Sequence, residues 1–351
     1  MVDYLGITIL LGSFILLLIL RTPISFALLA SAILTSFYLK VPLMSVAVQM
    51  VKGIHSFSLL AIPFFILAGE IMGAGGISRR IIEFTNVLVG RVRGGLAQVN
   101  ILASMFFGGI SGSAIADVSS IGALLIPMMK DSGYDTDYAV DVTITSACQG
   151  LIIPPSHNMI IFAVSAGQLF LGGMLPGVLL GMALMIISYV IAVKRGYPKG
   201  AKISFKEAIK IASSAILGLL TAVIIIGGVI GGIFTATESA AVACLYAFIV
   251  TFFIYREIPL SKMDEILLNA LRTLATVLAL LACCNAFGWF LAYLKIPALI
   301  TGALLGVSNN KIVVLLLINL LLLALGTIMD MAPLIMITTP ILMPVIQSIG
   351  M

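Results

Sequence analysis

Long apolar runs recur along the whole chain and predict its secondary structure. Runs of about 17–25 residues can cross a hydrocarbon layer roughly 30 Å thick as α-helices. The runs are continuously apolar and lack the alternation of membrane β-strands, so helices are predicted rather than a barrel. Charged residues, glycine or proline bound eight such spans, at residues 4–20, 23–38, 57–74, 138–164, 167–193, 208–231, 236–255 and 271–293.

Two further apolar regions, 96–129 and 312–347, are each interrupted near the middle by small and polar residues. Non-helical backbone is tolerated at membrane depth only where it is buried in protein or lines a cavity. Each region is therefore predicted to be a re-entrant hairpin, and a plain pair of spanning helices is the alternative. The interruptions read Gly108-Gly109-Ile110-Ser111-Gly112-Ser113 and Gly326-Thr327-Ile328-Met329-Asp330.

The charged residues of the loops orient the chain, because basic residues concentrate on the cytoplasmic side of a membrane. With the spans proposed, three basic clusters fall on one side, so the first hairpin enters from the cytoplasm and the second from the opposite side. Residues 41–56 and 258–270 are shorter and more amphipathic, which predicts helices lying in the membrane interface. The clusters are Arg79, Arg80, Arg91 and Arg93, then Lys194, Arg195, Lys199, Lys202, Lys206 and Lys210, then Arg256 and Lys262.

A sequence shift of 213 residues relates the two hairpin regions, since it places Asp117 on Asp330 and Pro127 on Pro340. Together with the reversed loop charge, this match predicts two inverted repeats, a common architecture of secondary transporters. Residues 1–205 form the first repeat, with a broken helix at 138–164, and residues 206–351 form the second. The second repeat has no counterpart of residues 131–205, so we expect roughly 75–80 further residues in a two-repeat protein.

Composition agrees with an all-α polytopic membrane protein. The 351 residues are 61% hydrophobic and 9% charged, whereas about 25% of the residues in soluble domains are charged. The net charge of +5 arises in the loop clusters that set orientation, so it does not indicate a nucleic-acid partner. The four cysteines lie in apolar runs without metal-site spacing, which favours packing over disulfide or metal use.

The span after the first hairpin contains Pro154 and Pro155, followed by Ser156, His157 and Asn158. Two adjacent prolines remove backbone donors and break a helix in the middle of the bilayer. The freed carbonyls, the hydroxyls and the dipole ends of half-helices are the usual means of holding Na⁺ and an anionic substrate at the midplane. In the alternative, the prolines only kink the helix, and Ser156 and Asn158 satisfy its backbone.

The hairpin interruptions are a second candidate site. Gly112 permits a tight turn, and Ser111 and Ser113 offer oxygens to a hard cation, although Gly-Ser pairs also serve close helix packing. A carboxylate inside the membrane, such as Asp117, indicates a functional role by default, although it also fits a capping role at the tip. The corresponding positions of the second hairpin are Gly326, Thr327 and Asp330.

Other ionisable residues are given structural roles. Glu238 follows Thr235 at the start of a span, where an acid caps the helix N-terminus. Glu70 lies near the cytoplasmic interface and is expected to be solvated or paired with an arginine. A single histidine in the broken span, His157, does not predict proton coupling.

Four stretches carry a resemblance to a known family: Ala61–Met72 (AIPFFILAGEIM), Ser111–Asp117 (SGSAIAD), Ile153–Ser156 (IPPS) and Gly232–Ala243 (GIFTATESAAVA). Together they resemble the large membrane (M) subunit of tripartite ATP-independent periplasmic (TRAP) transporters, the DctM-type subunit. Members of that family usually show Thr-Pro-Thr-Glu where this chain has Thr235-Ala236-Thr237-Glu238. The second Pro-Pro-type broken span of the family is absent.

The resemblance implies an elevator-type transport domain, built from the two hairpins and broken helices and driven by a sodium gradient, with no organic cofactor. It implies a small four-helix membrane subunit and a periplasmic substrate-binding protein as partners in the bacterial inner membrane. The substrates it implies are small carboxylates, namely C4-dicarboxylates, sialic acid or other sugar acids.

We therefore expect a multi-pass permease, not an enzyme, that imports a small carboxylate with Na⁺. An intramembrane enzyme would need converging acid/base or metal-ligand groups, which the sequence does not show. An ion channel is the third possibility, and inverted hairpins favour alternating access over a continuous pore. Sodium is expected at Ser111, Ser113, Ser156 and Asn158, within a wider ion and substrate site that adds Gly112, Asp117, Pro154, Pro155, Gly326, Thr327 and Asp330.

Overall fold

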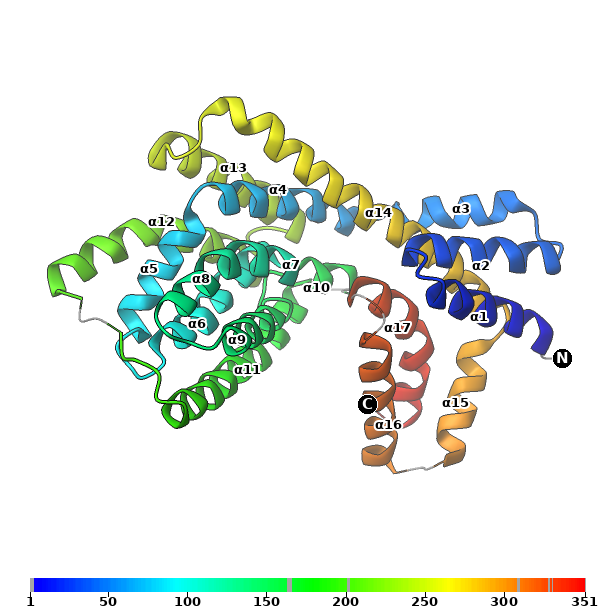
Figure 1. Cartoon of the computed structure of the whole chain (residues 1–351). Coiled ribbons are helices and arrows are strands. Elements are labelled where there is room, and N and C mark those ends of the chain that lie inside the picture. Colours follow the sequence, from blue (N-terminus) through cyan, green and yellow to red (C-terminus); the bar gives the residue numbers. More distant parts are fainter. Residues whose placement is uncertain are drawn as a thin grey trace. The chain divides into compact units, whose positions relative to one another are not determined.

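The computed structural model describes residues 3–162, 166–200, 203–307, 310–327, 329 and 331–350. All the regular elements of these residues are helices, as predicted. The chain divides into two compact units, which we name the central unit (residues 57–274) and the terminal unit (residues 1–56 and 275–351). Each unit combines segments from both predicted repeats, as the chain colouring in Figure 1 shows.

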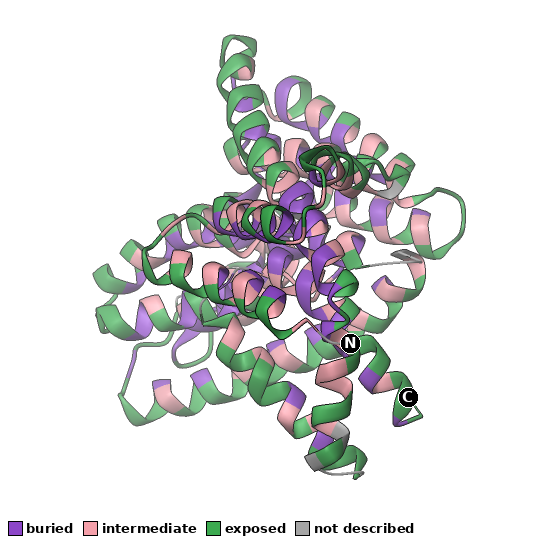
Figure 2. Ribbon diagram, turned by 90° about the vertical axis from the view of Figure 1, so that its right-hand side faces the viewer, coloured by how far each residue is buried: buried purple, intermediate pink, exposed green. Residues whose placement is uncertain are grey.

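Length and composition mark several helices of the described residues as membrane spans. Five are long and apolar enough to cross a bilayer, and a bent helix pair raises the number to six. Large apolar side chains on these helices face outward, such as Leu175, which is 66% exposed, and Val223, which is 62% exposed. Exposed positions run along the helices while buried positions gather where helices pack (Figure 2). Apolar exposure on this scale fits a surface that faces lipid rather than water.

The central unit begins with the short 3₁₀ helix η1 (Phe57–Leu60) and ends within the helix α14 (Met263–Tyr293). Between them the chain forms α4 (Ala61–Ala74), α5 (Ile77–Val89), α6 (Gly95–Ser111), α7 (Ala114–Asp117), η2 (Val118–Gly122), α8 (Ala123–Asp131), α9 (Thr136–Gln149), α10 (His157–Phe162), α11 (Ala166–Lys194), α12 (Phe205–Ile230), α13 (Ala236–Ile249), η3 (Val250–Tyr255) and η4 (Leu260–Lys262).

Helix α5 was not predicted from the sequence, which assigned its arginines to a loop. Its apolar positions follow the helical period, so that Ile77 and Ile81 are buried while Arg79 lies on the exposed side. A bend of 70° separates α4 from α5, and Gly76 at the bend has a φ of +69°, which glycine adopts without steric cost.

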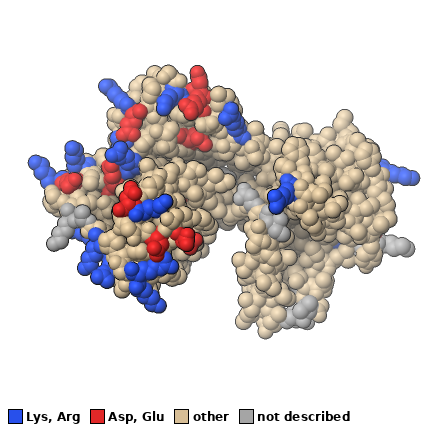
Figure 3. Space-filling view, in the orientation of Figure 1, with Lys and Arg blue, Asp and Glu red and all other residues tan. Residues whose placement is uncertain are grey.

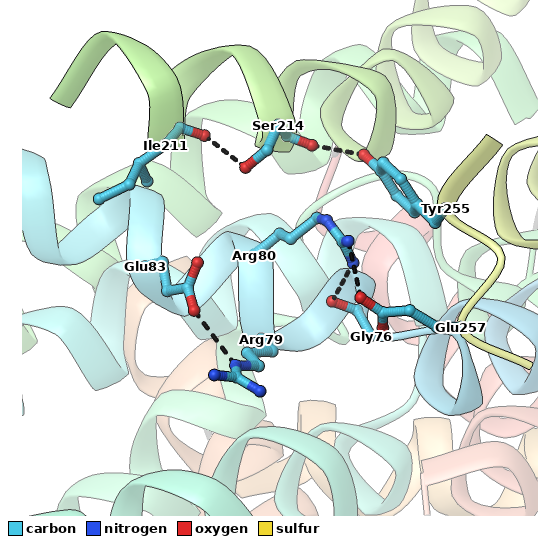
Figure 4. Close-up of polar contacts among 8 residues, drawn as sticks. All are labelled: Gly76, Arg79, Arg80, Glu83, Ile211, Ser214, Tyr255 and Glu257. Carbon is cyan, nitrogen blue, oxygen red and sulfur yellow. Dashed lines mark hydrogen bonds and ion pairs between the residues drawn. The ribbon is translucent and has the colours of Figure 1, made fainter. Parts of the chain in front are cut away.

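Arg80 fixes this bend to the end of η3. Its guanidinium lies 2.6 Å from a carboxylate oxygen of Glu257 and 3.7 Å from the centroid of the Tyr255 ring. Tyr255 in turn donates a hydrogen bond to the carbonyl of Ser214 on α12 (Figure 4). One arginine thus joins three segments that lie far apart in the sequence.

The first hairpin region consists of α6 followed by α7, the π-helix η2 and α8. The break lies at Gly112, which has a φ of +63°, and at Ser113, which is extended and caps α7 by accepting a hydrogen bond from the amide of Ala116. This position agrees with the interruption that the sequence predicted.

The terminal unit contains α1 (Tyr4–Ile19), α2 (Ile24–Tyr38), α3 (Leu43–Ile54), the second part of α14, α15 (Ile296–Val307), α16 (Lys311–Gly326) and α17 (Met331–Ser348). Its core includes Phe14 and Phe287, whose rings lie 5.2 Å apart. The amphipathic helix α3 is fixed to α14, because the amide of Asn285 donates to the carbonyl of Gln49 over 2.6 Å.

One expectation for a helix boundary in the second half was wrong. Residues 258–270 do not form a separate interfacial helix, since most of them continue directly into α14. The sequence contains no glycine or proline near residue 270 that would stop the helix. Helix α15 was also not predicted. By contrast, the predicted cap at Glu238 is confirmed, because Thr235 and Glu238 form a reciprocal capping box at the start of α13.

Candidate functional site

The first hairpin and the broken span meet backbone to backbone inside the central unit. A Cβ atom added to Gly108 of α6 would lie 2.3 Å from the Cα of Gly150, directly after α9. One added to Gly109 would lie 3.0 Å from the carbonyl oxygen of Pro154. Only glycine permits this approach, so the end of α6 lies directly against the interruption between α9 and α10.

Two helix C-termini therefore converge at one place. Helix α6 ends at Ser111 and α9 ends at Gln149. The last carbonyls of a helix lack intrahelical partners, and its C-terminal end carries a partial negative charge. Two such ends side by side favour a bound cation.

The three tip residues of the hairpin form a compact turn. Ser111 is buried, and its hydroxyl accepts a hydrogen bond from the amide of Ser113 over 3.4 Å. Gly69 of α4 packs against this turn, since a Cβ there would lie 3.6 Å from the Cα of Ser111. Ser111, Gly112 and Ser113 are thus held between α4 and the broken span.

The broken span has the interruption that its two prolines predict. Pro154 and Pro155 are buried and lie between α9 and α10. Ser156 and Asn158 are also buried, yet the Ser156 hydroxyl and the Asn158 side-chain oxygen have no hydrogen-bond partner among the described residues. An unsatisfied buried oxygen costs about 1–3 kcal/mol. Among the described residues the Ser156 hydroxyl therefore makes no hydrogen bond to the interrupted backbone.

Asp117, one turn beyond the tip, is fully buried in the central unit. The Ser104 hydroxyl lies near its carboxyl, but within the described part of the chain neither carboxylate oxygen has a hydrogen bond of acceptable geometry. A buried carboxylate is costly unless a proton or a cation neutralises it. The predicted capping role is filled instead by Ser113.

A buried polar network behind the site was not predicted from the sequence. Asn100 of α6 donates to the Thr143 hydroxyl over 2.7 Å and accepts from the Ser146 hydroxyl over 3.2 Å. The Ser146 hydroxyl also lies 3.2 Å from that of Ser104. The signal was present in the sequence: Asn100 and Ser104 are four residues apart on α6, and Thr143 and Ser146 are three residues apart on α9, so each pair lies on one helix face. The network fixes α9 to α6 and ends beside Asp117.

The predicted residues of the second hairpin belong to the terminal unit. Gly326 ends α16, and Thr327 follows it with its hydroxyl donating to the carbonyl of Ala324 over 2.7 Å. Both residues are exposed. Asp330 and the side chain of His157 lie outside the described residues.

The donor set of the site is made of oxygen atoms. In the described part of the chain, no three His, Cys, Asp or Glu side chains lie close enough to hold a metal ion. The central unit offers carbonyls, hydroxyls and an amide oxygen, which are ligands for a hard cation rather than for a transition metal.

Comparison with known proteins gives the family. The family model "Tripartite ATP-independent periplasmic transporter, DctM component" matches residues 11–351. The chain is 44% identical to the sialic acid TRAP transporter large permease protein SiaM of Vibrio cholerae, over 87% of this chain and 72% of that protein. It is 36% identical to the C4-dicarboxylate TRAP transporter large permease protein DctM of Pseudomonas aeruginosa, over 87% of this chain and 73% of that protein. It is 38% identical to the isethionate TRAP transporter permease protein DctMQ of Oleidesulfovibrio alaskensis, over 99% of this chain and 56% of that protein.

The fold has a solved counterpart in the YdaH transporter of Alcanivorax borkumensis. The two structures superpose with a TM-score of 0.58 at 14% identity, over 88% of this chain and 74% of that one. The chain thus belongs to the DctM family, the large permease component of TRAP transporters, and is a multi-pass inner-membrane transport protein rather than an enzyme.

Proposed function

We propose that the chain is the permease of a sodium-driven symporter that imports a small organic anion, a carboxylate by preference, received from a periplasmic binding protein. A small membrane subunit completes the proposed assembly. The observation that supports sodium most strongly is the contact between Gly108 and Gly150, which brings two helix C-termini together beside buried oxygens without partners.

The chemistry of these oxygens favours a monovalent cation. Calcium sites in proteins use several carboxylates, whereas Asp117 is the only carboxylate in residues 96–129. Carbonyl, hydroxyl and amide oxygens with little formal charge suit Na⁺, as in other transporters with broken helices. Ser111, Ser113, Ser156 and Asn158 are the proposed ligands, and Asp117 is the charged residue nearest in sequence to Ser111 and Ser113.

The substrate class is proposed from the relatives. SiaM and DctM are named for carboxylates, and DctMQ is named for isethionate, a sulfonate. All three compounds are small organic anions. Uptake competition between a C4-dicarboxylate, sialic acid and isethionate would therefore assign the anion.

Coupling is tested by uptake into proteoliposomes that contain this chain with its small subunit and binding protein. Radiolabelled substrate should accumulate under an inward Na⁺ gradient and not under an equal K⁺ gradient. Uptake that proceeds equally without Na⁺ would reject sodium coupling, and single-channel currents in planar bilayers would indicate a channel.

The site is tested separately by cation binding to the purified chain. Na⁺ should raise the thermal midpoint more than K⁺ does, because a ligand that binds only the folded state stabilises it. In Ser113→Ala and in Asn158→Ala, the Na⁺ concentration needed for the same rise in the thermal midpoint should be about tenfold higher. Ser119→Ala is the matched control, since Ser119 is an exposed serine of the same hairpin that bonds only to its own helix. A wild-type response in both variants would remove these residues from the site.

A further inference from the structure

A basic surface lies at the end of α11, formed by parts of the central unit that are far apart in the sequence. Arg93 and Lys199 face each other in an isolated antiparallel bridge, and the amide of Gly94 donates to the carbonyl of Pro198 over 3.0 Å. The Arg91 guanidinium donates to the carbonyl of Ile203 over 2.6 Å. These contacts join the turn between α5 and α6 to the connector that follows α11.

The joined segments carry four exposed cations, which we name the basic rim: Arg91 and Arg93 in the turn before α6, Lys194 at the end of α11 and Lys199 in the connector after it. Among the described residues none of the four has an ion pair, whereas the neighbouring Arg195 is paired with Asp135 at 2.8 Å. Figure 3 shows blue side chains along the lower left edge of the central unit, the region in which Figure 1 draws the lower end of α11.

The rim lies at a membrane boundary. Lys194 is the last residue of α11, one of the five helices that can span a bilayer. Directly before it, Val190 and Val193 are exposed on α11, and Leu88 and Val92 are exposed beside Arg91. Cations therefore lie next to apolar side chains. This surface is complementary to an anionic lipid, whose headgroup would contact the cations and whose acyl chains would contact the apolar side chains.

We propose that the basic rim binds the phosphate of an anionic phospholipid in the leaflet on this side of the membrane. Backbone contacts hold the two segments together before any ligand arrives, and the Arg91 guanidinium is fixed on the carbonyl of Ile203, so part of the ordering cost of binding is already met. The adjoining apolar surface gives a lipid contacts that inorganic phosphate cannot make. The lipid would fix the α5–α6 turn and the α11 connector to the bilayer surface. This proposal is independent of which ion and substrate the chain transports.

The test is thermal unfolding of the purified chain in a neutral detergent with phosphatidylglycerol, phosphatidylcholine or inorganic phosphate added. Phosphatidylglycerol should raise the midpoint by several degrees, and the other two should not. In Lys194→Gln/Lys199→Gln the apparent affinity for phosphatidylglycerol should fall about fivefold for each lysine removed. Neither lysine side chain has an ion pair among the described residues and both are exposed, so the variant is expected to fold.

Two further variants make the result specific. Arg256→Gln/Lys262→Gln removes the same charge elsewhere on the central unit and should leave the lipid response unchanged. Lys194→Arg/Lys199→Arg keeps the charge and should show the lipid response of the wild type. Equal stabilisation by phosphatidylcholine, equal stabilisation by inorganic phosphate, or an unchanged response in Lys194→Gln/Lys199→Gln would each overturn the proposal.

Discussion

Gly108 and Gly150 touch through their backbones, and this contact joins the first hairpin to the broken span. A Cβ atom on Gly108 would lie 2.3 Å from the Gly150 Cα, and one on Gly150 would lie 2.6 Å from the Gly108 Cα. Neither position has space for a side chain, so the geometry of the candidate site depends on both residues being glycine.

Gly108→Ala is therefore expected to separate α6 from the end of α9. Overpacking of this kind costs about 1–3 kcal/mol, and the thermal midpoint of the purified chain should fall accordingly. Transport should be lost together with the Na⁺ response, because the oxygens would move apart. Gly227→Ala on α12 is the control, since a Cβ there meets nothing within 4 Å and alanine favours a helix. An unchanged midpoint in Gly108→Ala would show that the contact is not required.

Removing one partner of the buried network should destabilise the central unit. Thr143→Val leaves the Asn100 amide without its acceptor at 2.7 Å, and an unsatisfied buried donor costs about 1–3 kcal/mol. Thr145→Val is the matched control two residues along α9, where the side chain is exposed and bonds only to its own helix. Denaturant or thermal unfolding should therefore separate the two variants. Equal stability of both would indicate that the network contributes nothing.

Arg80 should contribute more to stability than Arg79, its neighbour on α5. The Arg80–Glu257 pair is partly buried, with side chains 20% and 39% exposed, and Arg80 also lies over the Tyr255 ring. The Arg79–Glu83 pair is an exposed pair on one helix, with Arg79 76% exposed. Arg80→Ala is expected to cost about 1–2 kcal/mol, and Arg79→Ala less than about 0.5 kcal/mol. A double-mutant cycle on Arg80 and Glu257 would measure the coupling, and a value near zero would contradict this assignment.

Asp135 should make stability depend on pH in the acid range. Hydrogen bonds from the Tyr197 hydroxyl at 2.7 Å and from Arg195 at 2.8 Å lower the pKa of this carboxyl. A lowered folded-state pKa gives stability that is present above the unfolded value, about 3.9, and is lost as the pH falls through the folded value. Asp135→Asn should therefore lower the thermal midpoint at pH 7, and its difference from the wild type should shrink below about pH 4.

Asp141→Asn controls for the change of charge, because Asp141 is exposed on α9 and has no ion pair in the described part of the chain. The thermal midpoint of Asp141→Asn should stay close to that of the wild type at pH 7 and at pH 3. A constant difference between Asp135→Asn and the wild type from pH 7 to pH 3 would contradict the proposed role of the carboxylate.

The sequence by itself determined the class of protein and the elements that carry the site. Lipid is an apolar solvent, so membrane helices must be long and continuously apolar, and their interruptions stand out as Gly112 or Pro154-Pro155 do. Glycine and proline act through their own backbone geometry, so their effect on a helix can be predicted from the sequence alone. The expected Na⁺ ligands and the inverted repeats remain predictions.

The tertiary structure alone decided what lies beside what. Helix α5 stayed unrecognised because its arginines resemble a loop cluster until Ile77 and Ile81 are seen to be buried. Apolar periodicity did not show that Gly108 meets Gly150, or that Asn100 bonds to Thr143, because such contacts depend on how two helices pack. The basic rim arises in the same way: Arg93 and Lys199 are separated by more than a hundred residues in sequence and are joined by one backbone bridge.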